Sequence, residues 1–229
     1  MNYKYCNEKG ISKREYYKRR VYALVYTIHH YTGCRTKELL NLKWKHITIN
    51  PNDNAFDKKT NRVIHIPADN SKTGRSRDII APIGLQIERL IRWYREMGLE
   101  VDQKSDRYVF PRLTDTTKNE NIPTSDVAWT KRLRNVLAGA ERDGVIDLNG
   151  RNISNYCARH HHITEAIQRG VDIYDIALNC GTSLNYIEKT YSHITTLMRS
   201  RDITKGLGRQ ATYDPRKDEE YLKATRMGE

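Results

Sequence analysis

The spacing of hydrophobic residues changes twice along the chain, from a helical period to a strand period and back again. Between Ser12 and about Tyr31, apolar residues recur every three or four positions, which is typical of an amphipathic helix with one buried face. Ser12 and Glu15 have the spacing of a capping box, which predicts that this helix starts at Ser12. A second helix is expected to begin at Arg35, directly after a glycine turn.

The middle of the first half has the shorter period of strands. Runs rich in β-branched residues predict short strands at residues 47–49, 63–66 and 77–80. Turn-forming residues separate them, in a long polar turn at 50–54 and a tight turn at 70–74. We therefore expect a small antiparallel sheet.

Helical spacing returns after the third strand. Further helices are expected at residues 85–97, 126–140, 154–169 and 172–179, and from Ser183 onward. Gly170 and Gly181 end two of them, because glycine enters the left-handed C-cap conformation without strain. The expected fold class is α+β, mainly α-helical, with a small three-stranded antiparallel sheet.

Composition narrows the environment without fixing a function. The 229 residues include 40 Lys and Arg against 28 Asp and Glu, and the net charge of +12 fits a polyanionic partner and a well-solvated surface about equally well. The four cysteines form no C-x-x-C pair, so we expect reduced thiols, a cytoplasmic protein and no metal. No apolar run reaches the roughly 18 residues that a membrane helix needs.

One candidate site lies at the start of the second helix, in the segment Thr32-Gly33-Cys34-Arg35-Thr36-Lys37-Glu38-Leu39. Arg35 is placed where free backbone N–H groups and the helix dipole favour an anion. Glu38 lies one turn later on the same face and can hold the arginine in position. A glycine turn before a charged helix is also ordinary architecture, so this segment alone does not establish a site.

A second set of candidates lies between Arg151 and His193. It contains Tyr156-Cys157-Ala158-Arg159-His160, then Cys180-Gly181-Thr182, and Tyr191 nine residues after Thr182. Together with the first segment, these residues resemble the boxes of the tyrosine recombinases, or phage integrases, which read T-G-x-R-x-x-E-L, H-x-L-R-H and L-G-H-x-x-x-x-T-x-x-x-Y. The resemblance extends from about Tyr22 to His193.

The resemblance implies the tyrosine recombinase catalytic fold and a site-specific recombinase, or integrase, of a phage or mobile element. Arg35 and Arg159 would then clamp the scissile DNA phosphate with bidentate donor pairs. Tyr191 would be the nucleophile that forms a covalent 3′-phosphotyrosine, which conserves the bond energy without a cofactor. Lys72, in the 70–74 turn, matches the lysine of the family's K-T-G hairpin and would protonate the leaving 5′ oxygen.

The chain departs from the family pattern at two positions. Tyr156 and Thr182 stand where the family usually has histidine, or tryptophan at the second place. We expect Tyr156 to donate a hydrogen bond to the phosphate or to relay a proton, and Thr182 to donate one hydrogen bond. Glu38, His160 and His193 are expected to support the catalytic residues, although packing is the plainer role for any single histidine.

Basic residues outside these boxes are candidates for DNA contact. Arg75 and Arg77 follow Lys72 closely, and Lys131, Arg132 and Arg134 form a basic stripe on the 126–140 helix. A stripe of this kind can follow a DNA backbone. A solvated helix face explains it equally well.

The expected domains are a leader or linker at 1–10, a catalytic domain at 11–200 and a C-terminal tail at 201–229 that docks on a neighbouring protomer. The family usually has a further N-terminal domain that closes around DNA, so we favour a catalytic fragment over a naturally minimal protein. The expected partner is double-stranded DNA, bound at paired sites by a homotetramer that assembles from monomers, with accessory DNA-bending proteins as further partners. The expected location is the cytoplasm of a prokaryotic or phage-infected cell, at the nucleoid.

Two alternatives stay open at this point. A type IB topoisomerase-like enzyme would nick and close DNA by similar chemistry without exchanging strands. A DNA-binding protein with a decayed recombinase site would explain the departures at Tyr156 and Thr182. A covalent adduct on nicked DNA distinguishes either enzyme from a binding protein.

Overall fold

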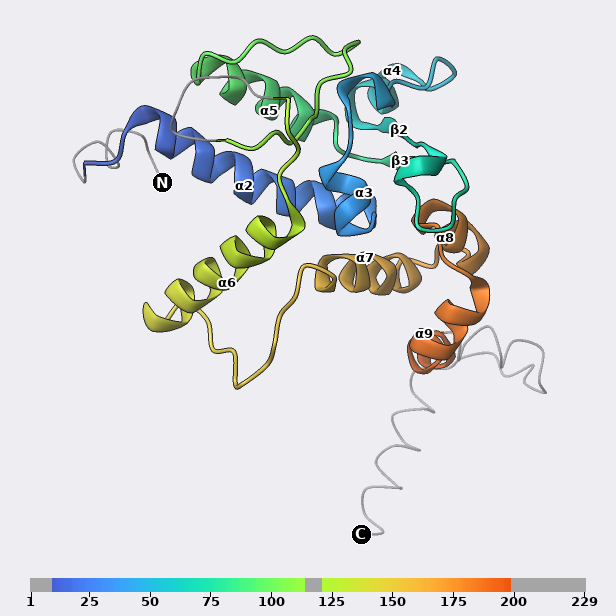
Figure 1. Ribbon diagram of the computed structural model, residues 1–229. Coiled ribbons are helices and arrows are strands. Elements are labelled where there is room, and N and C mark those ends of the chain that lie inside the picture. The colour runs from blue at the N-terminus through green and yellow to red at the C-terminus, as the bar shows by residue number, and fades with distance from the viewer. Residues whose placement is uncertain (1–9, 114–120, 199–229) are drawn as a thin grey trace, which may run out of the picture.

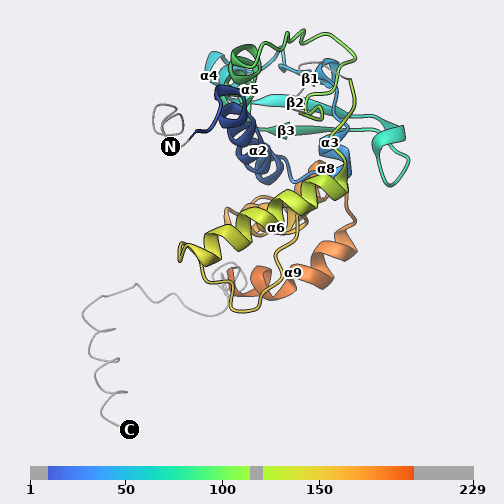
Figure 2. The ribbon, with the colours of Figure 1, turned by 60° about the vertical axis from the view of Figure 1, so that its left-hand side comes forward.

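The computed structural model describes residues 10–113 and 121–198, with side chains described as far as Ser192. The chain forms two layers, which Figures 1 and 2 show from two sides. The first layer holds a small sheet and the helices α2 (Lys13–Thr32), α3 (Thr36–Leu40), α4 (Ala55–Thr60) and α5 (Gly84–Glu96). The second layer holds α6 (Asp126–Arg142), α7 (Cys157–Gln168), α8 (Ile173–Cys180) and α9 (Leu184–Met198).

Helix α2 starts and ends where the sequence predicts. The Ser12 side chain accepts a hydrogen bond from the Glu15 backbone N–H at 3.2 Å, which satisfies one of the free donors of the first turn. Gly33 closes the helix in the left-handed conformation, and its N–H donates to the His29 carbonyl. Because this turn is short, Arg35 and α3 follow directly beside the end of α2.

The predicted three-stranded sheet is present and antiparallel. Its strands are β1 (Ile47–Thr48), β2 (Arg62–Ile66) and β3 (Arg77–Ala81), in the order β1-β2-β3. Ile64 pairs with Ile79, and both side chains are fully buried against the helices of the first layer. The polar connection between β1 and β2 differs from the prediction because it includes α4, which Asn54 caps. No residue of α4 is buried, so this helix has no hydrophobic period to predict it.

Two hydrophobic cores stabilise the layers. The larger core joins α2, the sheet and α5, whereas a smaller core joins α7, α8 and α9 through Ile163, Ile176 and Ile187. Each fully buried aliphatic side chain of this size contributes about 1.5–3 kcal/mol relative to exposure. Helix α8 also packs on the edge strand β3, where the Asn179 side chain accepts a hydrogen bond from the Ile80 N–H at 3.0 Å.

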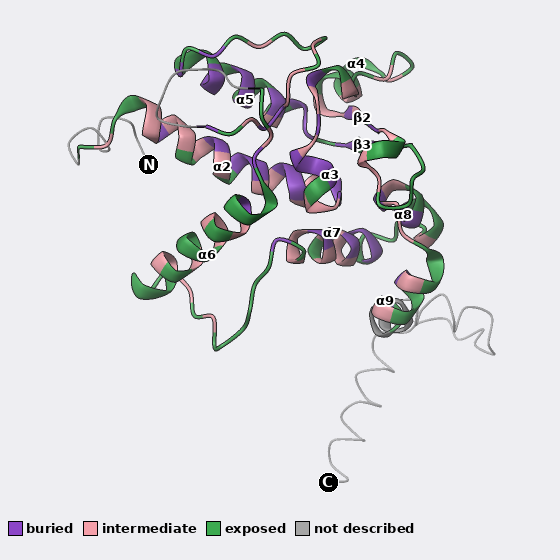
Figure 3. Ribbon diagram, in the orientation of Figure 1, coloured by how far each residue is buried: buried purple, intermediate pink, exposed green. Residues whose placement is uncertain are grey.

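Helix α6 is held mainly by one side chain. Trp129 is its one buried residue, and the indole stacks on the Tyr26 ring of α2 at 4.4 Å. The rest of the helix is largely exposed, as Figure 3 shows. Within the described residues, no helix is both long and apolar enough to cross a membrane.

Candidate active site

A buried carboxylate joins the two arginines nearest the sheet. Glu38 is 1% exposed, and its two oxygens accept hydrogen bonds from Arg35 Nη1 at 2.9 Å and from Arg77 Nη1 and Nη2 at 3.2 and 2.7 Å. Burial raises the pKa of the Glu38 carboxyl, but the hydrogen bonds from Arg77 and Arg35 outweigh burial and hold the pKa below its ordinary value. Glu38 therefore supports Arg35, as the helical spacing predicts.

The two arginines expected to bind phosphate meet at the C-terminal end of α8. Arg35 Nη2 donates to the Gly181 carbonyl at 2.7 Å, and Arg159 Nη1 donates to the neighbouring Cys180 carbonyl at 2.7 Å. Arg159 Nη1 also reaches the Gly33 carbonyl at 2.7 Å, which ties α7 to the end of α2. Adjacent backbone carbonyls thus hold both guanidinium groups side by side.

Glycine is required at both points where the backbone meets these arginines. Gly33 and Gly181 have φ values of +58° and +64°, in the left-handed region that side chains disfavour. A Cβ at Gly33 would lie 2.5 Å from His162 Cδ2, and one at Gly181 would lie 2.5 Å from Arg77 Cζ. The two glycines of the sequence boxes therefore allow the close approach that forms the site.

Arg159 is as deeply buried as Glu38. The residue is 1% exposed, and its Nε is buried without a hydrogen-bond partner among the described residues. A buried donor left without a hydrogen-bond partner costs about 1–3 kcal/mol, so this side chain is held in place at a cost.

The predicted nucleophile pairs with a histidine from the helix that carries Arg159. Tyr191 is 4% exposed, and its hydroxyl oxygen lies 2.5 Å from His160 Nδ1. Burial, followed by the neighbouring phenols of Tyr186 and Tyr156, raises the pKa of the Tyr191 phenol well above its ordinary value. The charge of Arg159 opposes this rise in pKa. Burial, followed by the charge of Arg159, lowers the pKa of His160. A neutral His160 can therefore accept the hydrogen bond of the tyrosine.

Tyr156 packs against this pair from the start of α7. Its ring meets the His160 ring edge-on, with the centroids 4.7 Å apart and the planes at 81°. A side-chain hydrogen bond with Tyr156, followed by burial, raises the pKa of Tyr186. Tyr186 lies on α9 together with Tyr191, and sequence reasoning missed it because it belongs to no recognised box.

Lys72 lies apart from the buried residues, on the connection between β2 and β3. Its exposed side chain lines an open cleft of about 780 Å³ together with Arg35, Thr182 and Tyr186. Arg75 lines the same cleft and is also exposed. The cleft therefore brings Lys72 and Thr182 to Arg35, whereas Tyr191 lies in the smaller core behind it.

The residues expected to contact DNA divide into two groups. Arg75, Lys131 and Arg134 are exposed. The Arg77 side chain is only 12% exposed, with its donors directed to Glu38 and to the end of α8, so the structure places it in the support of the site. Arg132 stacks over the Tyr22 ring at 3.5 Å. The side chain of His193, like residues 1–9, 114–120 and 199–229, lies outside the described part.

Comparison with known proteins relates the chain to one family. Residues 4–197 match the family model described as Phage integrase family. No curated protein sequence matches the chain significantly.

Two solved structures share the fold. The post-cleavage complex of the XerH site-specific recombinase bound to palindromic difH substrate has a TM-score of 0.53 at 21% identity, over 81% of this chain and 44% of that chain. The pre-cleavage complex of XerH bound to difH substrate has a TM-score of 0.52 at 20% identity, over 86% of this chain and 48% of that one. The likeness confirms the predicted fold class, and the chain spans less than half the length of these proteins.

Proposed function

Because the chain belongs to the phage integrase family, we propose that it is a site-specific DNA recombinase, or integrase, that cuts and rejoins strands through a covalent 3′-phosphotyrosine at Tyr191. One observation carries this proposal. Arg35 and Arg159 bind adjacent carbonyls at the end of α8, and the residue after Arg159 is hydrogen-bonded to Tyr191. Two fixed cations and a tyrosine with a proton acceptor are what phosphoryl transfer to a phenol requires.

The arginines stabilise the charge that develops on the phosphate. Attack on phosphorus adds negative charge to the non-bridging oxygens, and guanidinium groups offer these oxygens planar pairs of donors. Glu38 fixes Arg35, and the carbonyls at residues 33 and 180 fix Arg159, so little reorganisation is needed when the phosphate binds.

The cleavage step transfers one proton from the nucleophile and another to the leaving group. The Tyr191 oxygen attacks phosphorus, its proton moves to Nδ1 of neutral His160, and the bond from phosphorus to the 5′ oxygen breaks. Lys72 gives a proton to that oxygen from the connection between β2 and β3. Reversal with a different 5′ hydroxyl rejoins the strands, and no metal or cofactor takes part in these steps.

The buried tyrosine implies that helix α9 moves before attack. Tyr191 belongs to the small core, so its hydroxyl cannot meet a DNA phosphate without a shift of α9. Tyr156 and Thr182 then serve as hydrogen-bond donors to the phosphate, and His160 supplies the base that the usual histidine would provide. The hydrogen bond between His160 and Tyr191 favours an enzyme over a binding protein with a decayed site.

The assembly follows from the same proposal. The partner is double-stranded DNA, with Arg75, Lys131 and Arg134 among the contacts. The catalytic domain would span residues 11–200, and the 201–229 tail, which lies outside the described residues, would link the domain to a neighbouring protomer. Monomers would assemble on paired sites as a homotetramer, with accessory DNA-bending proteins, at the nucleoid of a prokaryotic or phage-infected cell.

Strand exchange in cells tests this function. The protein is expressed beside a plasmid that carries the DNA flanking its own gene, and the new junctions are sequenced. We expect junctions joined within one short sequence, which are lost in Tyr191→Phe and retained in Tyr174→Phe, a change at an exposed tyrosine of α8. Relaxation of supercoils without any junction would instead indicate a topoisomerase, and neither activity would indicate a binding protein.

A further inference from the structure

Three side chains that commonly bind metals meet where α2 packs against α7, away from the catalytic cleft. His30 Nδ1 lies 3.2 Å from His161 Nδ1, and His30 Nε2 lies 3.1 Å from Glu165 Oε2. His161 Nδ1 lies 3.8 Å from Glu165 Oε1, one helical turn along α7. One candidate ligand atom from each residue falls within 4.8 Å of the others, the one such group in the described part of the chain.

These distances are close to those of a tetrahedral metal site. Zinc lies about 2.0–2.1 Å from nitrogen and oxygen ligands, which sets its tetrahedral ligands roughly 3.3–3.4 Å apart. The separation of the two Nδ1 atoms is already near this value, and Glu165 Oε1 lies only slightly farther away, at 3.8 Å from His161 Nδ1. We propose that His30, His161 and Glu165 bind a divalent first-row transition metal ion, Zn²⁺ by preference, with a fourth position open to water.

The types of ligand decide the class of ion. Imidazole nitrogen and a single carboxylate suit zinc, copper and nickel, whereas magnesium and calcium require a set of oxygen ligands. His30 Nδ1 and His161 Nδ1 face each other, so at most one of these two nitrogens carries a proton. A metal ion in place of that proton would bind both nitrogens.

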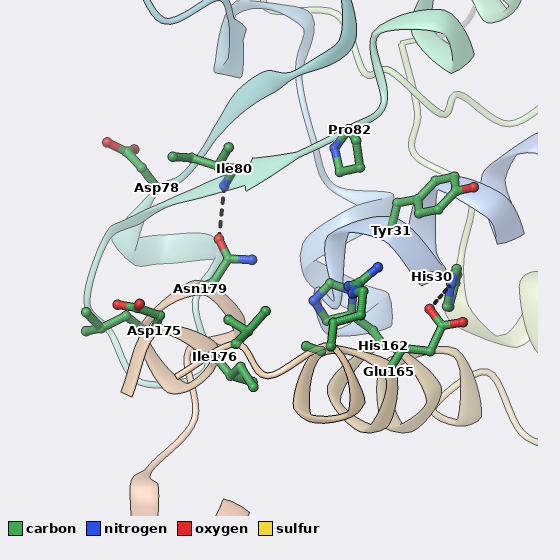
Figure 4. A pocket seen from close by; sticks show the side chains of 14 residues that line it. His30, Tyr31, Asp78, Ile80, Pro82, His162, Glu165, Asp175, Ile176 and Asn179 are labelled. Carbon is green, nitrogen blue, oxygen red and sulfur yellow. Dashed lines mark hydrogen bonds and ion pairs between the residues drawn. The ribbon is translucent and has the colours of Figure 1, made fainter. Parts of the chain in front are cut away.

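A neighbouring cavity provides access to the site. His30, His162 and Glu165 line a cavity of about 460 Å³ between α2, α7, α8 and β3. Figure 4 shows the Glu165 carboxylate facing the His30 ring at this cavity. An ion can therefore enter from solvent and keep a water ligand without displacing core residues.

The site would join the two elements that position the arginines. His30 lies in the last turn of α2, shortly before Gly33 and Arg35, and His161 lies two residues after Arg159 on α7. The ion touches no reacting atom in this arrangement. Its expected effect is to stabilise the contact between α2 and α7, because an ion that binds only the folded chain raises its stability.

Zinc binding by the untagged, chelator-treated full chain tests the proposal. Zn²⁺ is titrated in competition with a chromophoric chelator, and the melting temperature is measured with and without the ion. We expect one ion per chain and a higher melting temperature. His161→Ala removes one of three ligands and should weaken binding by at least about 100-fold, because even the loss of a partner outside the ligand set costs about 10–100-fold. The His161 side chain is 63% exposed, so its removal should leave the fold intact, which circular dichroism verifies.

An exposed histidine–carboxylate pair elsewhere provides the matched control. His65 Nδ1 lies 2.8 Å from Asp78 Oδ1 on the sheet, and no third ligand completes a group there among the described residues. His65→Ala should leave zinc binding unchanged, and Mg²⁺ should not raise the melting temperature. Absence of zinc binding at micromolar ion concentrations would overturn the proposal. Equal affinities for wild type and His161→Ala would also overturn it, because the ion would then be bound elsewhere.

Discussion

Removing the charge of Glu38 should destabilise the protein far more than removing the charge of an exposed glutamate. Glu38→Gln keeps the size of the side chain but replaces one oxygen by an amide that donates rather than accepts. At least one donor of Arg35 or Arg77 then loses its partner in a buried place. Breaking a buried pair in this way costs about 3–5 kcal/mol.

The size of this effect is measurable in a domain of this length. Domains are stable by about 5–15 kcal/mol, and each kcal/mol shifts the melting temperature by about 2–4 °C at 150–250 residues. We therefore expect Glu38→Gln to melt roughly 6–20 °C lower than wild type. The control is Glu96→Gln. Glu96 forms a 2.7 Å ion pair with Lys13, and the side chains of Glu96 and Lys13 are 40% and 50% exposed. Such a pair contributes about 0–1 kcal/mol, so this variant should melt close to wild type.

The pH dependence provides a second check of the same reasoning. The folded pKa of Glu38 lies below the ordinary value of 4.5, so in acid the unfolded chain binds more protons than the folded one. The stabilisation by this carboxylate is therefore complete above pH 4.5 and is lost as pH falls through the folded pKa. Urea unfolding should show that the difference in unfolding free energy between wild type and Glu38→Gln becomes smaller as pH falls from 4.5 through the folded pKa of Glu38. A difference that stays constant, or a neutral-pH loss no larger than for Glu96→Gln, would refute the proposed role of Glu38.

Three further changes test separate parts of the mechanism. Lys72→Ala should cleave ordinary DNA slowly but be largely rescued when sulfur replaces the leaving 5′ oxygen, since a thiolate needs little acid help; equal defects on both substrates would remove Lys72 from that role. His160→Gln should slow cleavage by about 100-fold or more in single-turnover assays and leave DNA binding intact, since it removes a proton acceptor; an unchanged rate would exclude His160 as the base. Truncation after Ser200 should preserve DNA binding but impair assembly and strand exchange, as measured by light scattering with a full site and by junction formation; unaffected assembly would exclude the tail as the link between protomers.

The sequence predicts much of the fold because its signals are local. A serine cap, a left-handed glycine and a hydrophobic period each act within a few residues, and together they give α2, the three strands and most later helices. The resemblance of the segments around Arg35, Lys72, Arg159 and Tyr191 to the family's boxes could also be seen in the sequence, because the spacing of residues within each box is fixed. Helix α4 was missed because its packing leaves no hydrophobic pattern.

The contacts within the site could not be predicted because they join distant segments. The bidentate pairing of Arg77 with Glu38 depends on how β3 packs beside α3, and no local spacing encodes it. A sequence with three consecutive histidines likewise does not say that His160 faces Tyr191 while His161 faces His30. The helix geometry of α7 turns these neighbours to different sides, and only the tertiary structure shows their partners.

Trapping the covalent intermediate tests the central claim most directly. The protein is incubated with a randomised pool of nicked DNA duplexes. Cleavage near the nick releases a short fragment, and the loss of that fragment prevents rejoining. Adducts that resist denaturant are then digested and mapped by mass spectrometry. The account predicts a nucleotide on the peptide that contains Tyr191. The adduct should be lost in Tyr191→Phe, with DNA binding kept within a few fold, and retained in Tyr174→Phe, a change at an exposed tyrosine. An adduct that persists in Tyr191→Phe, or that maps to another residue, would contradict it.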